Sequence, residues 1–524
     1  MAKRADTQKP NIETLPEALL AIKALEQENK LLREELALER ARRFGRSSES
    51  HVASGQQQFV FNEAESLAAK DHLATEPEVE QVIKEHKRRP KGKRNADLSR
   101  FEVKRIDYEL PEDKRVCPKC SGGLHEIGTD FRREVIYIPA TYHVDELHTH
   151  VYSCRHCQAH SDSTPVIRAD SPKALIPNSI ASASLVSQII ADKYVYHLPL
   201  YRQEVAFASD GLALSRQTIS NWVINTANTW LFSIYDAIKT RLLKSHDVLC
   251  ADETSVQVLN EQGRKASQKS YMWLYRTGAD AIHPLVCFEY QTTRSAAHPR
   301  NFLKEFTSGY LQSDGYQGYH TLGKSITSVG CWAHARRYFT DALKAMNKES
   351  RSGSLPEEGV RYLDKLFLLE REFADLEFTE RYQKRKELSE PLAQEFFRWV
   401  NQVSALPKSL LGKAINYAKE QRVYLLNVFA DGRLELSNNR AERSIRPFVV
   451  GRRNWLFSNT PKGAEASAMI YSIVETAKEN NLRAHDYIEY LLEKLPSMKT
   501  SELEDVMPWS DKLPDYIKVQ KTTT

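Results

Sequence analysis

Long hydrophobic runs are missing from this sequence of 524 residues. No stretch approaches the roughly 18 consecutive apolar residues that a membrane-spanning helix requires, so we expect no membrane segment. Met1-Ala2-Lys3-Arg4 is not followed by an apolar stretch, so we expect no secretory signal either. The length is too great for a single hydrophobic core and predicts several domains.

Cysteine is also scarce, with seven residues in all. Three thiols stand alone, at Cys250, Cys287 and Cys331, and the other four form two close pairs. An odd number of cysteines that includes isolated thiols argues against a disulfide framework. The composition therefore favours a protein of a reducing cytoplasm.

Neither sign of charge dominates, because 74 Lys and Arg almost balance 69 Asp and Glu and leave a net charge of +5. The basic residues are nevertheless concentrated in two segments, residues 84–105 and residues 433–453. Such segments can simply be solvated, but Pro90 and Gly92 keep the first one extended, which suits contact with a polyanion. We predict that this basic arm contacts DNA through Lys87, Arg88, Arg89, Lys91, Lys93 and Arg94.

Residues 14–43 predict one long helix with coiled-coil spacing. The two apolar heptad positions hold Leu15, Ile22, Asn29 and Leu36, and Ala18, Leu25 and Leu32. A single asparagine at a core position favours a parallel dimer with a fixed register. The alternative is an amphipathic helix that packs on its own chain. The polar residues 44–100 are predicted to be a linker that carries the basic arm.

Residues 101–168 contain two cysteine pairs, each with two residues between the thiols. This gap lets both sulfurs of a pair reach one metal ion, and the stretch between the pairs alternates like a β-hairpin. The pattern predicts a zinc ribbon that binds one Zn²⁺ through Cys117, Cys120, Cys154 and Cys157. Because four protein ligands leave no position for water, the zinc should be structural rather than catalytic.

Residues 177–232 predict a helix-turn-helix region that binds DNA. A helix over 179–196 is followed by one over 200–208, a turn at Asp210-Gly211, and a third helix that Ser215 caps. Helical hairpins are common, but the polar start of the third helix suits base recognition. The side chains expected to reach base edges are Arg216, Gln217, Ser220 and Asn221.

Residues 245–342 predict strands that carry two aspartates. Asp252 lies on the apolar face of an alternating strand, where a carboxylate needs either an arginine partner or a metal ion. Asp314 follows a later strand and is followed by Gly315, which alone is typical of a turn. Residues 343–431 predict a helical insertion, and residues 481–524 a C-terminal helical cap and tail.

Residues 432–480 contain Glu442 near the start of a further helix. Asn438 or Asn439 caps this helix, and a capping box between Asn439 and Glu442 is one interpretation. The other is that Glu442 points toward the two aspartates. Three such carboxylates suit two Mg²⁺ or Mn²⁺ ions, which together can clamp both oxygens of a phosphoryl displacement. The order of elements predicts an RNase H-like core within a multidomain α/β protein.

Several motifs together resemble the IS66 family of insertion-sequence transposases over nearly the whole chain. Besides the cysteine pairs and the N-terminal helix, they are Phe44-Gly45-Arg46-Ser47-Ser48-Glu49, Ala251-Asp252-Glu253-Thr254, Ser313-Asp314-Gly315-Tyr316, Cys331-Trp332-Ala333-His334-Ala335-Arg336-Arg337 and Ser437-Asn438-Asn439-Arg440-Ala441-Glu442-Arg443. The resemblance implies a DDE transposase with Asp252, Asp314 and Glu442 as its acidic triad. It also implies a helical insertion before the glutamate.

Other residues near these motifs have both a functional and a structural interpretation. His334, three residues after Cys331, either contacts the scissile phosphate or supports the triad, or else is a core histidine. Glu253 should point to the strand face opposite Asp252, so we do not count it as a metal ligand. The basic residues around Glu442 either bind phosphates or form a solvated face. They are Arg440, Arg443, Arg446, Arg452 and Arg453.

These features predict a Mg²⁺-dependent DNA transposase of the bacterial cytoplasm, associated with the nucleoid. It would bind the terminal inverted repeats of its element, hydrolyse phosphodiesters at the ends and join the 3′-hydroxyls to target DNA. The expected partners are double-stranded DNA, a second copy or a larger synaptic assembly, and accessory proteins encoded by the element. The alternatives are a transposase-derived regulator that no longer cuts and a metal-dependent nuclease without strand transfer.

Overall fold

The computed structural model describes residues 15–44, 141–153, 166–323 and 325–519. The chain divides into two compact units, one of residues 76–171 and one of residues 1–75 with 172–524. In the first unit, β1 (Val151–Ser153) pairs antiparallel with β2 (Val166–Arg168). The basic arm and all four predicted zinc ligands lie outside the described residues.

The second unit is built on a five-stranded mixed sheet with the strand order β5-β4-β3-β6-β7. Strand β4 is antiparallel to both of its neighbours, β3 and β5, whereas β6 and β7 run parallel to β3. The strands span Val248–Gln257 (β3), Lys269–Thr277 (β4), Val286–Gln291 (β5), Gly309–Gln312 (β6) and Ile326–Val329 (β7). The strands predicted from the sequence are thus confirmed as a single mixed sheet.

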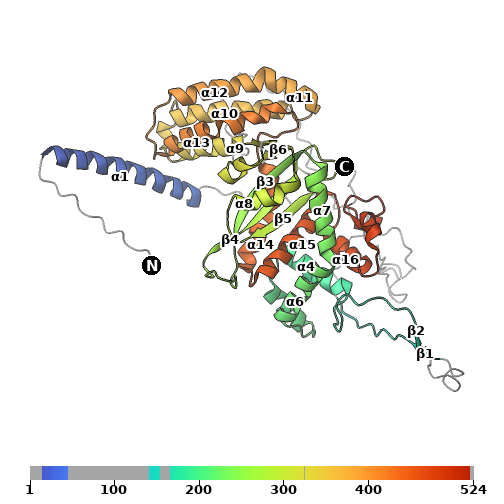
Figure 1. Cartoon of the computed structure of the whole chain (residues 1–524). Coiled ribbons are helices and arrows are strands. Elements are labelled where there is room, and N and C mark those ends of the chain that lie inside the picture. The colour runs from blue at the N-terminus through green and yellow to red at the C-terminus, as the bar shows by residue number, and fades with distance from the viewer. Residues whose placement is uncertain (1–14, 45–140, 154–165, 324, 520–524) are drawn as a thin grey trace, which may run out of the picture. The chain divides into compact units, whose positions relative to one another are not determined.

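Helices cover the sheet and enclose the larger of two hydrophobic cores (Figure 1). Helix α15 (Pro461–Glu479) packs on β5, and almost all of its residues from Ala464 to Ala477 are buried. Small side chains such as Ala466 and Ser472 allow the helix to lie close to the strand, and the Ser472 hydroxyl accepts a bond from the Phe288 N–H. Helices α7 (Phe232–Ser245), α14 (Asn439–Trp455) and α16 (Ala484–Lys494) complete this layer.

The three helices predicted within residues 177–232 are present in the structure. They are α4 (Ala183–Tyr194), α5 (Leu200–Ser209) and α6 (Arg216–Thr226). The Ser215 hydroxyl accepts the Thr218 N–H, which confirms the predicted cap. The expectation that the first helix begins near 179 is wrong, because Ser182 caps α4 by accepting the Leu185 N–H. A π-helical turn, Ala227–Leu231, joins α6 directly to α7.

The segment before Glu442 is helical, as predicted, and has a core of its own. Helices α10–α13 pack together with α9 (Trp332–Lys344) (Figure 1). Trp332 and Phe339 of α9 contact the aromatic rings of α12. The insertion helices span Leu355–Glu372 (α10), Phe378–Lys384 (α11), Glu390–Gln402 (α12) and Leu410–Leu426 (α13).

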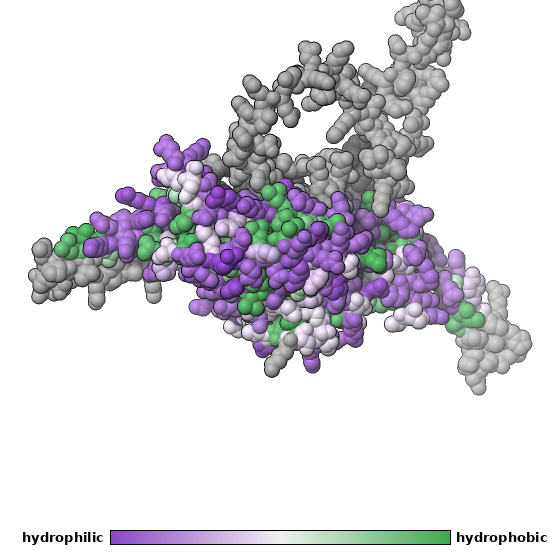
Figure 2. Space-filling view, turned by 90° about the horizontal axis from the view of Figure 1, so that it is seen from above, coloured by the Kyte–Doolittle hydropathy of each residue, from purple (hydrophilic) through white to green (hydrophobic). Residues whose placement is uncertain are grey.

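The N-terminal segment forms α1 (Leu15–Phe44), in agreement with the predicted long helix. Its heptad side chains Ile22, Leu25, Leu32 and Leu36 are each more than half exposed. No helix among the described residues is long and apolar enough to cross a membrane. The face in Figure 2 is largely hydrophilic, with hydrophobic residues in scattered patches.

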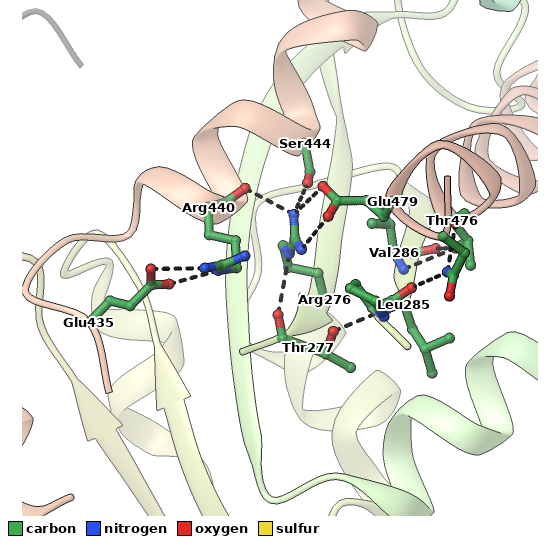
Figure 3. A network of polar contacts seen from close by, with 11 residues as sticks. Arg276, Thr277, Leu285, Val286, Glu435, Arg440, Ser444, Thr476 and Glu479 are labelled. Atoms are coloured by element: carbon green, nitrogen blue, oxygen red, sulfur yellow. Dashed lines mark hydrogen bonds and ion pairs between the residues drawn. The ribbon is translucent and has the colours of Figure 1, made fainter. Parts of the chain in front are cut away.

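A buried arginine joins the sheet to the helices that cover it. Arg276, at the end of β4, is 1% exposed and donates to both oxygens of Glu479 on α15, at 2.9 and 3.2 Å (Figure 3). It also donates to the Ser444 hydroxyl and the Arg440 carbonyl on α14. One guanidinium thus fixes two helices, because a shift of either helix breaks the bonds that join it to Arg276.

We predict that Arg276→Met destabilises the protein. The methionine leaves the Glu479 carboxylate without its partner inside the fold, at a cost of about 3 kcal/mol in free energy of unfolding. This value is the lower end of the range for broken buried pairs, because Glu479 is partly exposed. Thermal and urea unfolding would measure the change. Arg300→Met, on an exposed arginine, is the control, and equal stability of the two variants would contradict the prediction.

Candidate active site

The register of two parallel strands brings the predicted aspartates together. β3 pairs with β6 so that Val248 lies opposite Tyr310 and Cys250 opposite Gln312. The same register continued by two residues places Asp252 beside Asp314, which follows the end of β6. Side chains two residues apart along a strand share a face, so Asp252 lies on the face of Cys250 and Asp314 on the face of Gln312. The two aspartates therefore extend from neighbouring strands at the centre of the sheet.

Asp252 lies in a strongly acidic environment. The surrounding protein raises the pKa of its carboxyl well above the ordinary value, chiefly by burial and then by repulsion from Glu253, Asp314 and Glu442. The Glu253 N–H opposes this effect by donating to Asp252 Oδ1 at 2.8 Å. The three predicted acids therefore meet in one electrostatic cluster, although Glu442 is 128 positions beyond Asp314 in the chain.

The Asp314 loop is a tight turn with contacts on both sides. Asp314 Oδ1 accepts the Tyr316 N–H at 3.1 Å, and Gly315 between them has φ +97°, a conformation that favours glycine. From the helical insertion, the Tyr417 hydroxyl donates to the Asp314 carbonyl at 3.0 Å. The turn predicted at Asp314-Gly315 is confirmed, and it also presents the Asp314 carboxylate to the acidic cluster.

Glu442 reaches the cluster because the start of α14 is fixed to the strand of Asp252. Asn438 occupies the cap position, but its side chain makes no capping bond and instead donates to the Ala251 carbonyl at 2.8 Å. The Asn438 N–H donates to the Cys331 sulfur, whose pKa burial raises to about 12, so it remains a neutral thiol. The structure gives Asn438 a tertiary role in place of side-chain capping.

The Cys331–Arg337 motif contributes two groups that face Glu442. His334 Nδ1 lies 3.8 Å from one carboxylate oxygen, and an Arg337 guanidinium nitrogen lies 3.9 Å from the other. Burial lowers the pKa of His334, which favours a neutral imidazole at neutral pH. His334 Nδ1 and Glu442 Oε1 are both buried and have no hydrogen-bond partner among the described residues. The sequence interpretation missed Arg337, although it stands in a motif already recognised.

The donor chemistry of the cluster fits a hard divalent cation. Asp252, Asp314 and Glu442 supply only oxygen ligands, their charges repel one another, and one Glu442 oxygen lacks a hydrogen bond. Within the described ranges, however, no group of three or more His, Cys, Asp or Glu residues is placed to hold a metal ion. The three carboxylates thus lie in one electrostatic cluster, but their side chains are not arranged as metal ligands in this structure.

The predicted DNA-contacting residues that the structure describes fall into two groups by exposure. Arg216, Gln217 and Asn221 are exposed on α6 and Ser220 is half-buried, and the Gln217 amide donates to Asn221 at 2.9 Å. On α14, Arg446 and Arg453 are exposed. The remaining three arginines are half-buried: Arg440 pairs with Glu435 at 2.8 Å, Arg452 donates to Thr254 at 3.0 Å, and burial lowers the pKa of Arg443.

These features define a mixed α/β protein with an acidic cluster at the centre of its sheet. Comparisons with known proteins identify its family. The family model "Transposase IS66 family" matches residues 178–466, which is more than half of the chain. The "zinc-finger binding domain of transposase IS66" matches residues 114–158, a range that includes all four paired cysteines. The "IS66 C-terminal element" matches residues 472–509, and "Transposase C of IS166 homeodomain" matches residues 31–103.

The chain belongs to the IS66 transposase family. It is 30% identical to the uncharacterized protein y4jD of Sinorhizobium fredii (strain NBRC 101917 / NGR234), over 80% of this chain and 83% of that protein. The uncharacterized protein y4qI of the same strain is 30% identical over 82% of this chain and 79% of its own length. No solved structure matches the chain at a significant level.

Asn438→Ala is expected to disturb the acidic cluster. It removes the bond to the Ala251 carbonyl inside the fold, at a cost of about 1–3 kcal/mol in free energy of unfolding. Chemical denaturation would measure that cost. Ser437→Ala, one residue earlier, is the control, and a variant as stable as this control would show that α14 is held without the Asn438 side chain.

Proposed function

We propose that the protein is a DNA transposase that cleaves phosphodiesters at the ends of its element and joins the 3′-hydroxyls to target DNA with two bound Mg²⁺ or Mn²⁺ ions. The observation that carries this proposal is the convergence of Asp252, Asp314 and Glu442 from three separate elements on one acidic site. Membership of the IS66 transposase family supports it.

The strand arrangement supports an RNase H-like core. Three antiparallel strands, β3 to β5, form one side of the sheet, and two strands parallel to β3 extend the other side. The first acid lies on the first strand and the second acid follows the fourth. A helical insertion then separates these strands from the helix that carries Glu442, and the proposed core is therefore 245–342 and 432–480.

Each group in the site has a proposed role in the reaction. Asp252, Asp314 and Glu442 would hold the divalent ions, which would supply Lewis-acid chemistry for phosphoryl transfer. The Arg337 guanidinium, 47% exposed, binds a phosphate next to the scissile one. His334, neutral by virtue of its lowered pKa, orients Glu442 or contacts the scissile phosphate without adding a competing charge.

The other regions are proposed to recognise and synapse the DNA ends. The exposed Arg216, Gln217 and Asn221 on α6 suit base-edge contacts, and the basic arm and zinc ribbon add phosphate contacts. The exposed apolar side chains along α1 suit a coiled coil between two copies, which would bring two element ends together. Accessory proteins encoded by the element remain proposed partners.

Asp252→Asn, Asp314→Asn and Glu442→Gln are each expected to reduce cleavage of an element-end duplex at least 10³-fold. Binding of the uncut duplex should stay within about threefold, because the proposed DNA-recognition residues lie elsewhere. Gel assays of cleavage and band shifts would measure the two effects. Asp236→Asn, on an exposed aspartate of α7, is the control.

Outcomes of this experiment separate the alternatives. Unchanged cleavage in all three variants would contradict the metal assignment. End binding by a wild-type protein that never cuts would indicate a regulator derived from a transposase. If wild-type protein cuts but does not join pre-cut ends with free 3′-hydroxyls, it is a nuclease without strand transfer.

Removal of zinc is expected to impair DNA-end binding but not the catalytic core. Elemental analysis of purified protein should find one zinc per chain, and Cys117→Ser or Cys154→Ser should lose it because each removes one of four thiolates. Cys287→Ser, which changes a buried thiol in β5, is the control. Full zinc content in the Cys117 and Cys154 variants would contradict the ligand assignment.

A further inference from the structure

Glu253, the neighbour of Asp252, is held by two hydrogen-bonding partners from distant segments. Its side chain is 2% exposed, and one oxygen accepts from Arg294 Nε at 2.8 Å and also from Arg294 Nη2. The other oxygen accepts the Tyr319 hydroxyl at 2.7 Å. Both oxygens of Glu253 thus accept hydrogen bonds from protein groups.

Arg294 also contacts the loop that carries Asp314. Its guanidinium carbon lies 4.3 Å from the centroid of the Tyr316 ring, and the Tyr316 hydroxyl donates to the Arg294 carbonyl. The Tyr316 N–H in turn donates to Asp314. A continuous set of contacts therefore runs from the residue beside the first acid to the second acid through one arginine.

Aromatic rings lie on one side of this arginine, and solvent lies on the other. Trp273 lies opposite Glu253 in the β3–β4 register, and its ring contacts those of Tyr316 and Tyr319 with centroids 6.1 and 5.9 Å apart. Arg294 itself lies in the loop between β5 and α8 (Ala297–Phe302), with 42% of its side chain exposed. Arg294 thus approaches Glu253 from the surface, next to a cluster of three aromatic rings.

We propose that Glu253 and Arg294 form a positioning clamp that sets the spacing of Asp252 and Asp314. Glu253 fixes one end because it adjoins Asp252 on β3, and the Arg294–Tyr316 stack fixes the other end at the Asp314 loop. An arginine is required because its planar fork bonds the carboxylate while its face stacks on the ring, which a lysine cannot do. This inference rests on the proposed function, since the two aspartates are the proposed Mg²⁺ ligands.

The clamp is tested by Mg²⁺ binding to the full-length protein in the absence of DNA. Binding is measured by the rise in melting temperature and by calorimetry. Arg294→Gln, Arg294→Lys and Glu253→Gln should each weaken Mg²⁺ binding about tenfold or more, as the loss of groups that orient metal ligands does. The Mg²⁺ concentration for half-maximal cleavage should rise in parallel. The double variant Glu253→Gln/Arg294→Gln should resemble the single variants, because all break one clamp.

Arg300→Gln is the matched control, because this exposed arginine on α8 bonds only Thr321 among the described residues. It should bind Mg²⁺ like the wild type. The melting temperature without Mg²⁺ and the binding of element-end DNA show whether a variant is misfolded. If Arg294→Lys and Arg294→Gln fold and bind Mg²⁺ with wild-type affinity, the clamp is overturned.

Asp252→Ala distinguishes this failure from failure of the proposed function. If Asp252→Ala loses Mg²⁺ binding and the Arg294 variants keep it, the clamp alone is wrong. If Asp252→Ala binds Mg²⁺ like the wild type, the metal site is wrong and the clamp is overturned with it.

Discussion

The buried guanidinium of Arg276 is the contact on which the arrangement of the candidate active site depends. A charged group inside the fold is tolerated only when its donors are paired, and here the partners come from α14 and α15. The need to satisfy one side chain therefore fixes the helix of Glu442 against the sheet. Asn438 adds a second attachment at the start of that helix, next to Asp252.

The acidic cluster is costly to the folded protein, and this cost is informative. Burial and repulsion from three neighbouring carboxylates raise the pKa of Asp252, whereas a purely structural site would place a cation among these groups. The nearby arginines lie at its margins: Arg294 holds Glu253, and Arg337 approaches Glu442 from α9. The centre is left negative, which is the condition under which divalent ions bind.

The helical insertion is part of the site as well as a separate core. Its Tyr417 reaches the Asp314 carbonyl, and the Tyr424 carbonyl accepts the N–H of Gly330 at the end of β7. Tyr417 from the insertion and Arg294 therefore contact opposite ends of the Asp314 loop. A loop with φ +97° at Gly315 has no regular secondary structure to stabilise it, so such tertiary contacts determine its position.

The sequence by itself determined the order of strands and helices, the Ser215 cap, the turn at Asp314 and the family, because periodicity, turn residues and motifs are local signals. Strand alternation in the sequence argued against Glu253 as a metal ligand, and the sequence indicated only a capping role for Asn438. Only the tertiary structure joined Asn438 to Ala251, Arg276 to Glu479 and Arg294 to Tyr316. These contacts link positions 22 to 203 residues apart, and no local pattern specifies which distant donor will satisfy a given buried acceptor.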